Sequence, residues 1–119
     1  MQARKTEGLT VNQSNLQQIV EAVKNVVPLR AAYLFGSYAY GEPNSDSDFD
    51  IYLVADSIDG SKHDKLVALY TAVQEVAEKP TDVLLNTKAH YDRRKDYCGT
   101  LEYKIEREGI RLYEHGSIQ

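Results

Sequence analysis

The chain has 119 residues, of which 42% are hydrophobic and 27% are charged, an ordinary composition for a globular domain. Its 18 acidic side chains outnumber its 14 basic ones, giving a formal net charge of −4. This balance argues against a general nucleic-acid-binding protein, which carries a marked excess of lysine and arginine. No apolar run approaches the roughly 18 residues of a membrane-spanning helix, and the first residues show no signal-peptide pattern.

The length of the chain and its cysteine and tyrosine content indicate the number of domains, the redox environment and possible interfaces. Residues 1–119 are predicted to form one domain with one hydrophobic core, with loosely held ends at residues 1–9 and 115–119. Cys98 is the only cysteine, so no disulfide forms within the chain and we expect a reducing, cytoplasmic environment. The nine tyrosines form either a partner-facing cluster, in a homo- or hetero-oligomer, or scattered residues at the edge of the core.

The first half of the chain reads as one helix followed by two strands. Two capping-box patterns, beginning at Thr10 and Ser14, each predict the start of a helix, and Pro28 stops its apolar run. The apolar residues Ala31–Phe35 predict a first strand. A second strand is predicted over Asp48–Ala55.

The second half continues this alternation. An amphipathic helix is predicted over His63–Glu78, and a short buried strand over Thr81–Leu85. A last helix is predicted from Tyr97 to Glu108, with Gly109 as the C′ residue just beyond its end, and a final strand over Ile110–Tyr113. Alternating helices and strands predict an α/β or α+β fold in which helices lie on a sheet.

One stretch between the first two strands combines features suited to phosphate and metal chemistry. Gly36 and Ser37 form a corner after the first strand, where glycine lets the backbone approach a phosphate closely. Asp48 and Asp50 open the second strand and point the same way, because side chains alternate along a strand. Two carboxylates on one face, near a phosphate-sized corner, suit a divalent metal and phosphoryl transfer.

Other interpretations of the acidic residues fit the sequence less well. Asp46, Asp48 and Asp50 begin like a calcium-binding loop, but Ile51 stands where that loop needs glycine. No P-loop motif is present, and the three histidines are too scattered for a zinc site. A frame one step earlier, with Asp46 and Asp48 as the pair, remains an alternative.

The order Gly36-Ser37, ten residues, Asp48-Phe49-Asp50 resembles the signature of the DNA polymerase β-like nucleotidyltransferases. It is most similar to the minimal single-domain members, which include antitoxins that act on HEPN-domain toxins. The similarity covers roughly residues 15–113, while the specific motif is confined to residues 36–50 and one later aspartate. The resemblance implies a small mixed sheet with helices packed mainly on one face, left partly open near the aspartates.

The resemblance also implies roles for individual residues. Gly36 and Ser37 would bind the nucleotide phosphates, and Asp48, Asp50 and a third carboxylate would hold two Mg²⁺ ions. Asp82 is the candidate for that third carboxylate, because it opens the strand at Val83 as Asp50 opens its own strand. Tyr40 departs from the family pattern, in which many members carry arginine at this position.

A basic group follows the strand that Asp82 opens and offers a further contact for a triphosphate or an acidic partner. Its members alternate with two tyrosines, and the group comprises Lys88, Arg93, Arg94 and Lys95. The alternative is a solvated charge run on a loop and a helix start. Lys104, on the last predicted helix, is a weaker candidate.

The function implied by the resemblance is Mg²⁺-dependent transfer of AMP from ATP to a hydroxyl, with a tyrosine of a HEPN-domain toxin as the leading acceptor. One alternative is a module of the same fold that neutralises its partner by contact alone, which Tyr40 keeps open. The other is transfer to a small molecule such as an aminoglycoside, although those enzymes carry an additional domain for the drug. Direct binding to nucleic acid or to a membrane is not expected.

Overall fold

The computed structural model describes residues 10–41 and 48–115. The ends predicted to be loose lie outside these residues, except for residue 115, as does the turn around Asp46. In chain order the elements are α1 (Thr10–Lys24), β1 (Leu29–Phe35), α2 (Ser37–Tyr40), β2 (Phe49–Ala55), α3 (Lys62–Val76), β3 (Thr81–Thr87), α4 (Lys88–Arg94), α5 (Leu101–Glu108) and β4 (Ile110–Glu114). None of the described helices is long and apolar enough to cross a membrane.

The strands form one mixed sheet in the order β3-β2-β1-β4. β1 runs antiparallel to β2 and β4, whereas β2 and β3 are parallel. The register places Asp50 beside Asp82 on the neighbouring strand, and Phe35, the last residue of β1, opposite Asp50. The mixed sheet confirms the predicted fold class. Its pairing places the last residue of β1 and the first residues of β2 and β3 at the same end of the sheet.

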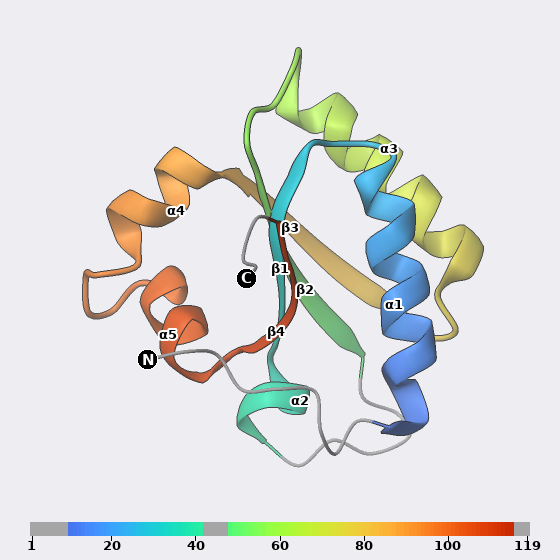
Figure 1. The fold of residues 1–119 in the computed structure, drawn as a ribbon, viewed down its shortest axis with the longest axis horizontal. Helices are drawn as coiled ribbons and strands as arrows, with labels where there is room; N and C mark the ends of the chain where they lie inside the picture. Colours follow the sequence, from blue (N-terminus) through green and yellow to red (C-terminus); the bar gives the residue numbers. More distant parts are fainter. Residues whose placement is uncertain (1–9, 42–47, 116–119) are drawn as a thin grey trace.

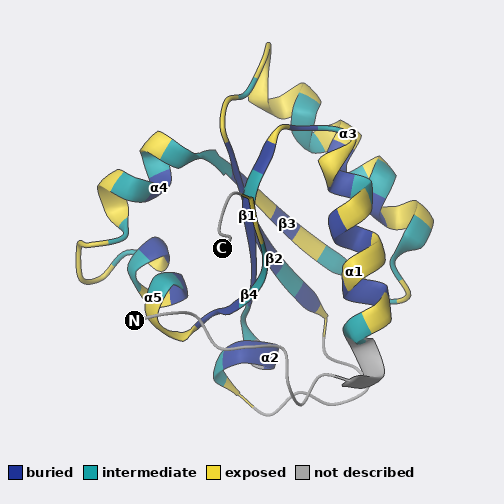
Figure 2. Ribbon diagram, in the orientation of Figure 1, coloured by how far each residue is buried: buried dark blue, intermediate teal, exposed yellow. Residues whose placement is uncertain are grey.

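The two longest helices, α1 and α3, cover one face of the sheet, and the shorter α4 and α5 cover part of the other (Figure 1). The buried residues of these two helices belong to the hydrophobic core on this first face of the sheet (Figure 2). The second face carries Tyr33, Tyr52 and Val54, which pack against Tyr91 of α4 and Ile105 of α5. The long helices therefore lie on one side, as predicted, and the second face is only partly covered.

The segment between β3 and β4 differs from the sequence prediction. It forms two short helices, α4 and α5, where one helix from Tyr97 was expected. Each helix is capped by a threonine: the Thr87 hydroxyl accepts the His90 N–H at 3.2 Å, and the Thr100 hydroxyl accepts the Tyr103 N–H at 3.0 Å. α4 has seven residues, too few for apolar periodicity to reveal it, whereas α5 lies within the predicted helix and ends with it at Glu108.

Gly109 ends α5 for a reason other than the predicted one. Its φ is −70°, so it does not take the left-handed conformation expected of a glycine at this position. Instead its N–H donates to the Ile105 carbonyl at 2.9 Å, and a Cβ here would lie 2.7 Å from that oxygen. Glycine is required by the close approach of the two backbone segments.

A buried carboxylate fastens α5 to the second face. Glu102 is 4% exposed and accepts hydrogen bonds from the Tyr52 hydroxyl at 2.7 Å and from Arg94 Nε at 3.0 Å. Burial alone would raise the pKa of Glu102, but these two donors outweigh it and hold the pKa below its usual value. Asn86 of β3 joins the network by donating to the same Tyr52 hydroxyl at 3.0 Å.

We expect Glu102→Gln to destabilise the fold by about 1–3 kcal/mol at neutral pH, because it removes the charged acceptor of the buried Tyr52 hydroxyl and of the exposed Arg94 guanidinium. A lowered pKa stabilises the folded state above the ordinary glutamate range, and this stabilisation is lost as the pH falls through the folded-state pKa. The deficit of the variant should therefore shrink in acid. Urea unfolding at several pH values measures it, with the exposed Glu75→Gln as the control. Equal stability of the two variants would contradict the anchoring role.

Candidate functional site

Gly36 makes the turn that joins β1 to α2, and it touches the Asp50 side chain. Its φ is +76°, a left-handed conformation that favours glycine, and a Cβ here would lie 2.1 Å from Asp50 Oδ2. Ser37 begins α2 directly after this turn, and the Tyr40 N–H closes the helical turn by donating to the Gly36 carbonyl at 2.8 Å. The predicted corner therefore exists, and the backbone at Gly36 lies against a carboxylate.

The three candidate aspartates lie at the same end of the sheet. Asp50 and Asp82 are paired residues on adjacent strands, and Asp48 lies two positions before Asp50. Burial raises the pKa of Asp50 first, and the negative charges of Asp82 and Asp48 raise it further. Asp48 and Asp82 are exposed, whereas Asp50 is half-buried, so the cluster faces solvent on the second face of the sheet.

These carboxylates fit a divalent cation by their chemistry. Carboxylate oxygens are the ligands that Mg²⁺ prefers, and the raised pKa of Asp50 marks a concentration of negative charge that a cation would relieve. Within residues 10–41 and 48–115, no group of three acidic, histidine or cysteine side chains is placed so as to hold a metal ion. Asp50 and Asp82 are close enough to share a hydrogen bond, which adds to the raised pKa of Asp50.

Tyr40 lies on α2 beside the corner rather than in the acidic cluster. Its hydroxyl is buried and has no hydrogen-bond partner in the described part of the chain. Burial, followed by the charge of Glu108, raises the pKa of Tyr40 to about 12. The Lys104 ammonium of α5 lies 4.4 Å from the centre of its ring. Sequence reasoning noted Tyr40 and Lys104 separately, and only the fold brings them together.

The predicted basic group does not line the acidic cluster. Lys88 pairs with Asp92 at 2.6 Å, and Lys95 lies 3.7 Å from the same carboxylate. Arg94 is engaged by the buried Glu102. These three cations are therefore neutralised within α4 and α5, which fits the solvated-charge interpretation of this stretch.

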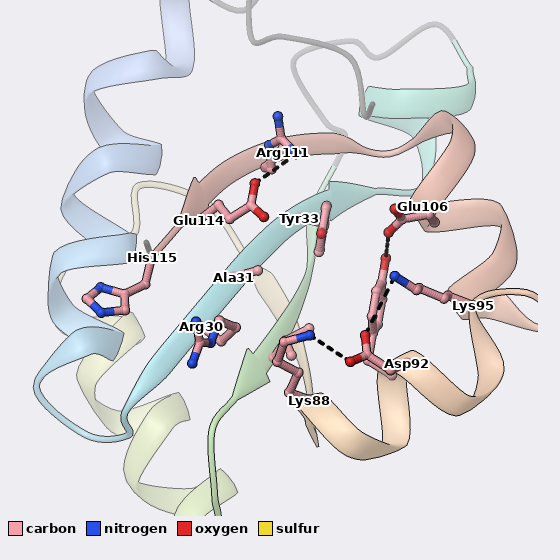
Figure 3. Close-up of a pocket in the computed structure, with 12 residues that line it drawn as sticks. Arg30, Ala31, Tyr33, Lys88, Asp92, Lys95, Glu106, Arg111, Glu114 and His115 are labelled. Carbon is pink, nitrogen blue, oxygen red and sulfur yellow. Dashed lines mark hydrogen bonds and ion pairs between the residues drawn. The ribbon is translucent and has the colours of Figure 1, made fainter. Parts of the chain in front are cut away.

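A cavity of about 240 Å³ opens on the second face, away from the aspartates (Figure 3). Its lining includes Ala31 and Val54, which are paired residues of β1 and β2. Val54 lies four residues beyond Asp50 on β2, which corresponds to about 13 Å along the strand. Its charged walls are internally paired, with Lys88 on Asp92 and Arg111 on Glu114 at 2.9 Å (Figure 3). We therefore assign no binding role to this cavity.

Comparison with known proteins identifies the family. Residues 17–117 match the sequence profile described as Polymerase beta, Nucleotidyltransferase. The chain belongs to this family of nucleotidyltransferases. No curated protein matches the chain.

Solved structures share the fold at low sequence identity. A mutant of the toxin-antitoxin pair MntA-HpeT has a TM-score of 0.59 at 19% identity, over 85% of this chain and 74% of that one. A candidate nucleotidyltransferase from Sulfolobus solfataricus has a TM-score of 0.58 at 21% identity, over 88% and 82%. A toxin-antitoxin structure with AMP-PNP has a TM-score of 0.52 at 20% identity, over 86% and 75%. These similarities confirm the polymerase β-like fold.

Gly36→Ala is expected to destabilise the chain more than Gly60→Ala. Both glycines have a positive φ, +76° and +72°, so each substitution carries a conformational cost of roughly 1–2 kcal/mol. Only at Gly36 does the new Cβ meet another atom, Asp50 Oδ2, whereas nothing lies within 4 Å at Gly60. The difference between the two free energies of unfolding isolates the contact with Asp50. Equal losses would mean that Asp50 moves away without cost.

Asp50→Asn is expected to raise the melting temperature at neutral pH. A raised pKa means that the folded state holds the Asp50 proton more tightly than the unfolded state, so ionisation opposes folding. This penalty disappears as the pH falls towards the ordinary aspartate value of about 3.9, and the advantage of the variant should disappear with it. Thermal unfolding from neutral to acid pH measures the trend, with the exposed Asp59→Asn as the control. A pH-independent gain would contradict the electrostatic cause.

Proposed function

We propose that this chain transfers AMP from ATP to a hydroxyl of a partner protein in a Mg²⁺-dependent reaction. The leading acceptor is a tyrosine of a HEPN-domain toxin, so that the chain acts as an antitoxin in the cytoplasm. The observation that carries the proposal is the contact of the Gly36 backbone with Asp50, beside Asp82 and Asp48. This arrangement places a strand-to-helix corner, of the kind that binds phosphates, beside a carboxylate set suited to Mg²⁺.

The residues of the site take distinct roles in this reaction. Gly36 lacks a side chain where the Asp50 carboxylate lies, which brings the corner and the carboxylate together, and Ser37 follows it at the start of α2. Asp48, Asp50 and Asp82 would hold Mg²⁺, two ions by analogy with the family, which would neutralise charge on the reacting phosphates. The acceptor oxygen forms a bond to the α-phosphorus as the bond to the β-phosphate breaks and pyrophosphate leaves. Asp82, exposed at the edge of the cluster, receives the hydroxyl proton.

Related structures and the surface near the site support a protein acceptor. One similar structure is a toxin-antitoxin with AMP-PNP, and another carries two Asp-to-Glu substitutions two positions apart, the spacing of Asp48 and Asp50. Leu84 lies two residues beyond Asp82 on the same face of β3 and is 40% exposed. An exposed leucine beside the carboxylates offers an apolar contact to a docked protein.

A binding module without catalysis is the second candidate. The exposed apolar side chains Leu84 and Tyr97, 40% and 67% exposed, would serve a contact inhibitor equally well. The two candidates differ in the chemistry they require, because contact alone needs neither Asp48 nor Asp50. Transfer to a small molecule, the third interpretation, differs from both in needing no protein partner.

The test is intact-mass measurement of a HEPN-domain protein encoded beside this chain, after incubation with the chain, ATP and Mg²⁺. We expect the mass to rise in whole units of AMP. The Asp48→Asn, Asp50→Asn double variant should give no gain, because the carboxylates that would hold Mg²⁺ are removed, whereas Asp59→Asn should act as the wild type.

A pure binding module gives a different result in the same experiment. The partner would form a stable complex, keep its mass, and remain neutralised by the double variant. That outcome would overturn the enzymatic proposal and leave the contact mechanism in its place.

A further inference from the structure

Two lysines from separate segments lie over the two tyrosine rings of α2. Lys104 of α5 places its ammonium 4.4 Å from the centre of the Tyr40 ring. Lys79, just before β3, lies 5.1 Å from the centre of the Tyr38 ring and donates to its hydroxyl at 2.5 Å. α2 is the single helical turn that follows Gly36, so both ammonium groups lie against the side chains of this turn.

The two lysines lie on different sides of the sheet. Tyr38 packs in the core of the first face, 5.3 Å from the Phe49 ring, and Lys79 also lies over Phe49. Lys104 belongs to α5, which covers part of the second face. Asp50 shares that face, because it lies two residues before Tyr52 on β2. Lys104 therefore extends from a helix on the face that carries Asp50, and the Tyr40 ring beneath it packs against the core of the first face.

Lys104 is held by no ion pair within the described part of the chain. It is exposed, and Lys88 and Arg94, by contrast, are held in ion pairs. A cation over a half-exposed aromatic ring is held only weakly, and the flexible lysine stem lets the ammonium turn towards a stronger partner. The Tyr40 ring thus holds a positive charge on the residue whose N–H donates to the Gly36 carbonyl.

We propose that Lys104 binds the β- and γ-phosphates of the nucleotide and makes the site selective for triphosphates over monophosphates. This inference rests on the proposed function, because it names the group that would contact the leaving pyrophosphate. A phosphate oxygen accepts a charge-assisted hydrogen bond, which holds an ammonium more strongly than an aromatic ring does. Lys104 therefore leaves Tyr40 when a triphosphate binds, and it offsets negative charge that grows on the departing pyrophosphate.

Calorimetry with AMP-PNP and with AMP, both in Mg²⁺, tests this assignment. Lys104→Met keeps the apolar stem and removes the charge, so we expect affinity for AMP-PNP to fall about 10-fold or more. Affinity for AMP should stay unchanged, because AMP lacks the outer phosphates. Lys104→Arg should recover most of the loss, since it restores a cation.

Lys79→Met is the matched control, because it removes the same charge from over the other tyrosine of α2. We expect its affinity for AMP-PNP to stay within about twofold of the wild type, the range of a general change in net charge. The inference is overturned if Lys104→Met leaves AMP-PNP binding intact, weakens AMP equally, or matches Lys79→Met. Failure of the wild-type chain to bind AMP-PNP at all would instead overturn the proposed function.

Discussion

The contact between the Gly36 backbone and the Asp50 carboxylate is the constraint on which the site depends. A Cβ at position 36 would lie 2.1 Å from Asp50 Oδ2, and the φ of +76° also favours glycine. Glycine therefore lets the end of β1, the start of α2 and the start of β2 meet at one point. Parallel pairing of β2 with β3 then adds Asp82 to the same place.

Two carboxylates on the second face of the sheet have opposite electrostatic character. Glu102 accepts hydrogen bonds from Tyr52 and Arg94, and its pKa is lowered despite burial. Asp50 is buried in part, lies among other negative charges, and its pKa is raised. The first carboxylate stabilises the attachment of α5 to the sheet, whereas the second carries unfavourable charge that a bound cation would relieve. Glu102 thus contributes to stability, whereas Asp50, on the same surface, is a candidate for binding a cation.

The basic side chains near this surface also differ in whether they are neutralised by a carboxylate. Lys88 and Arg94 of α4 are neutralised by neighbouring carboxylates and hold the helices in place. Lys104 instead lies over the Tyr40 ring, beside the corner at Gly36, without an ion-pair partner among the described residues. The chain as a whole is acidic, with a net charge of −4, so the positive charge near a bound nucleotide would come from metal ions and a few placed side chains.

The sequence by itself determined the long elements and the motif. Apolar periodicity located α1 and α3, because each spans several helical turns, and Asp48 and Asp50 share a face through the two-residue repeat of a strand. Only the tertiary structure decided which distant residues meet. Strand order and register set Asp82 beside Asp50, and the docking of α5 set Lys104 over Tyr40, because both pairings depend on packing between segments far apart in the chain. The short helix α4 escaped prediction, because seven residues show little apolar periodicity, whereas α5 was predicted with its end at Glu108. Threonine caps, the buried Glu102 and the apolar contacts of Tyr91 and Ile105 hold the two helices on the sheet.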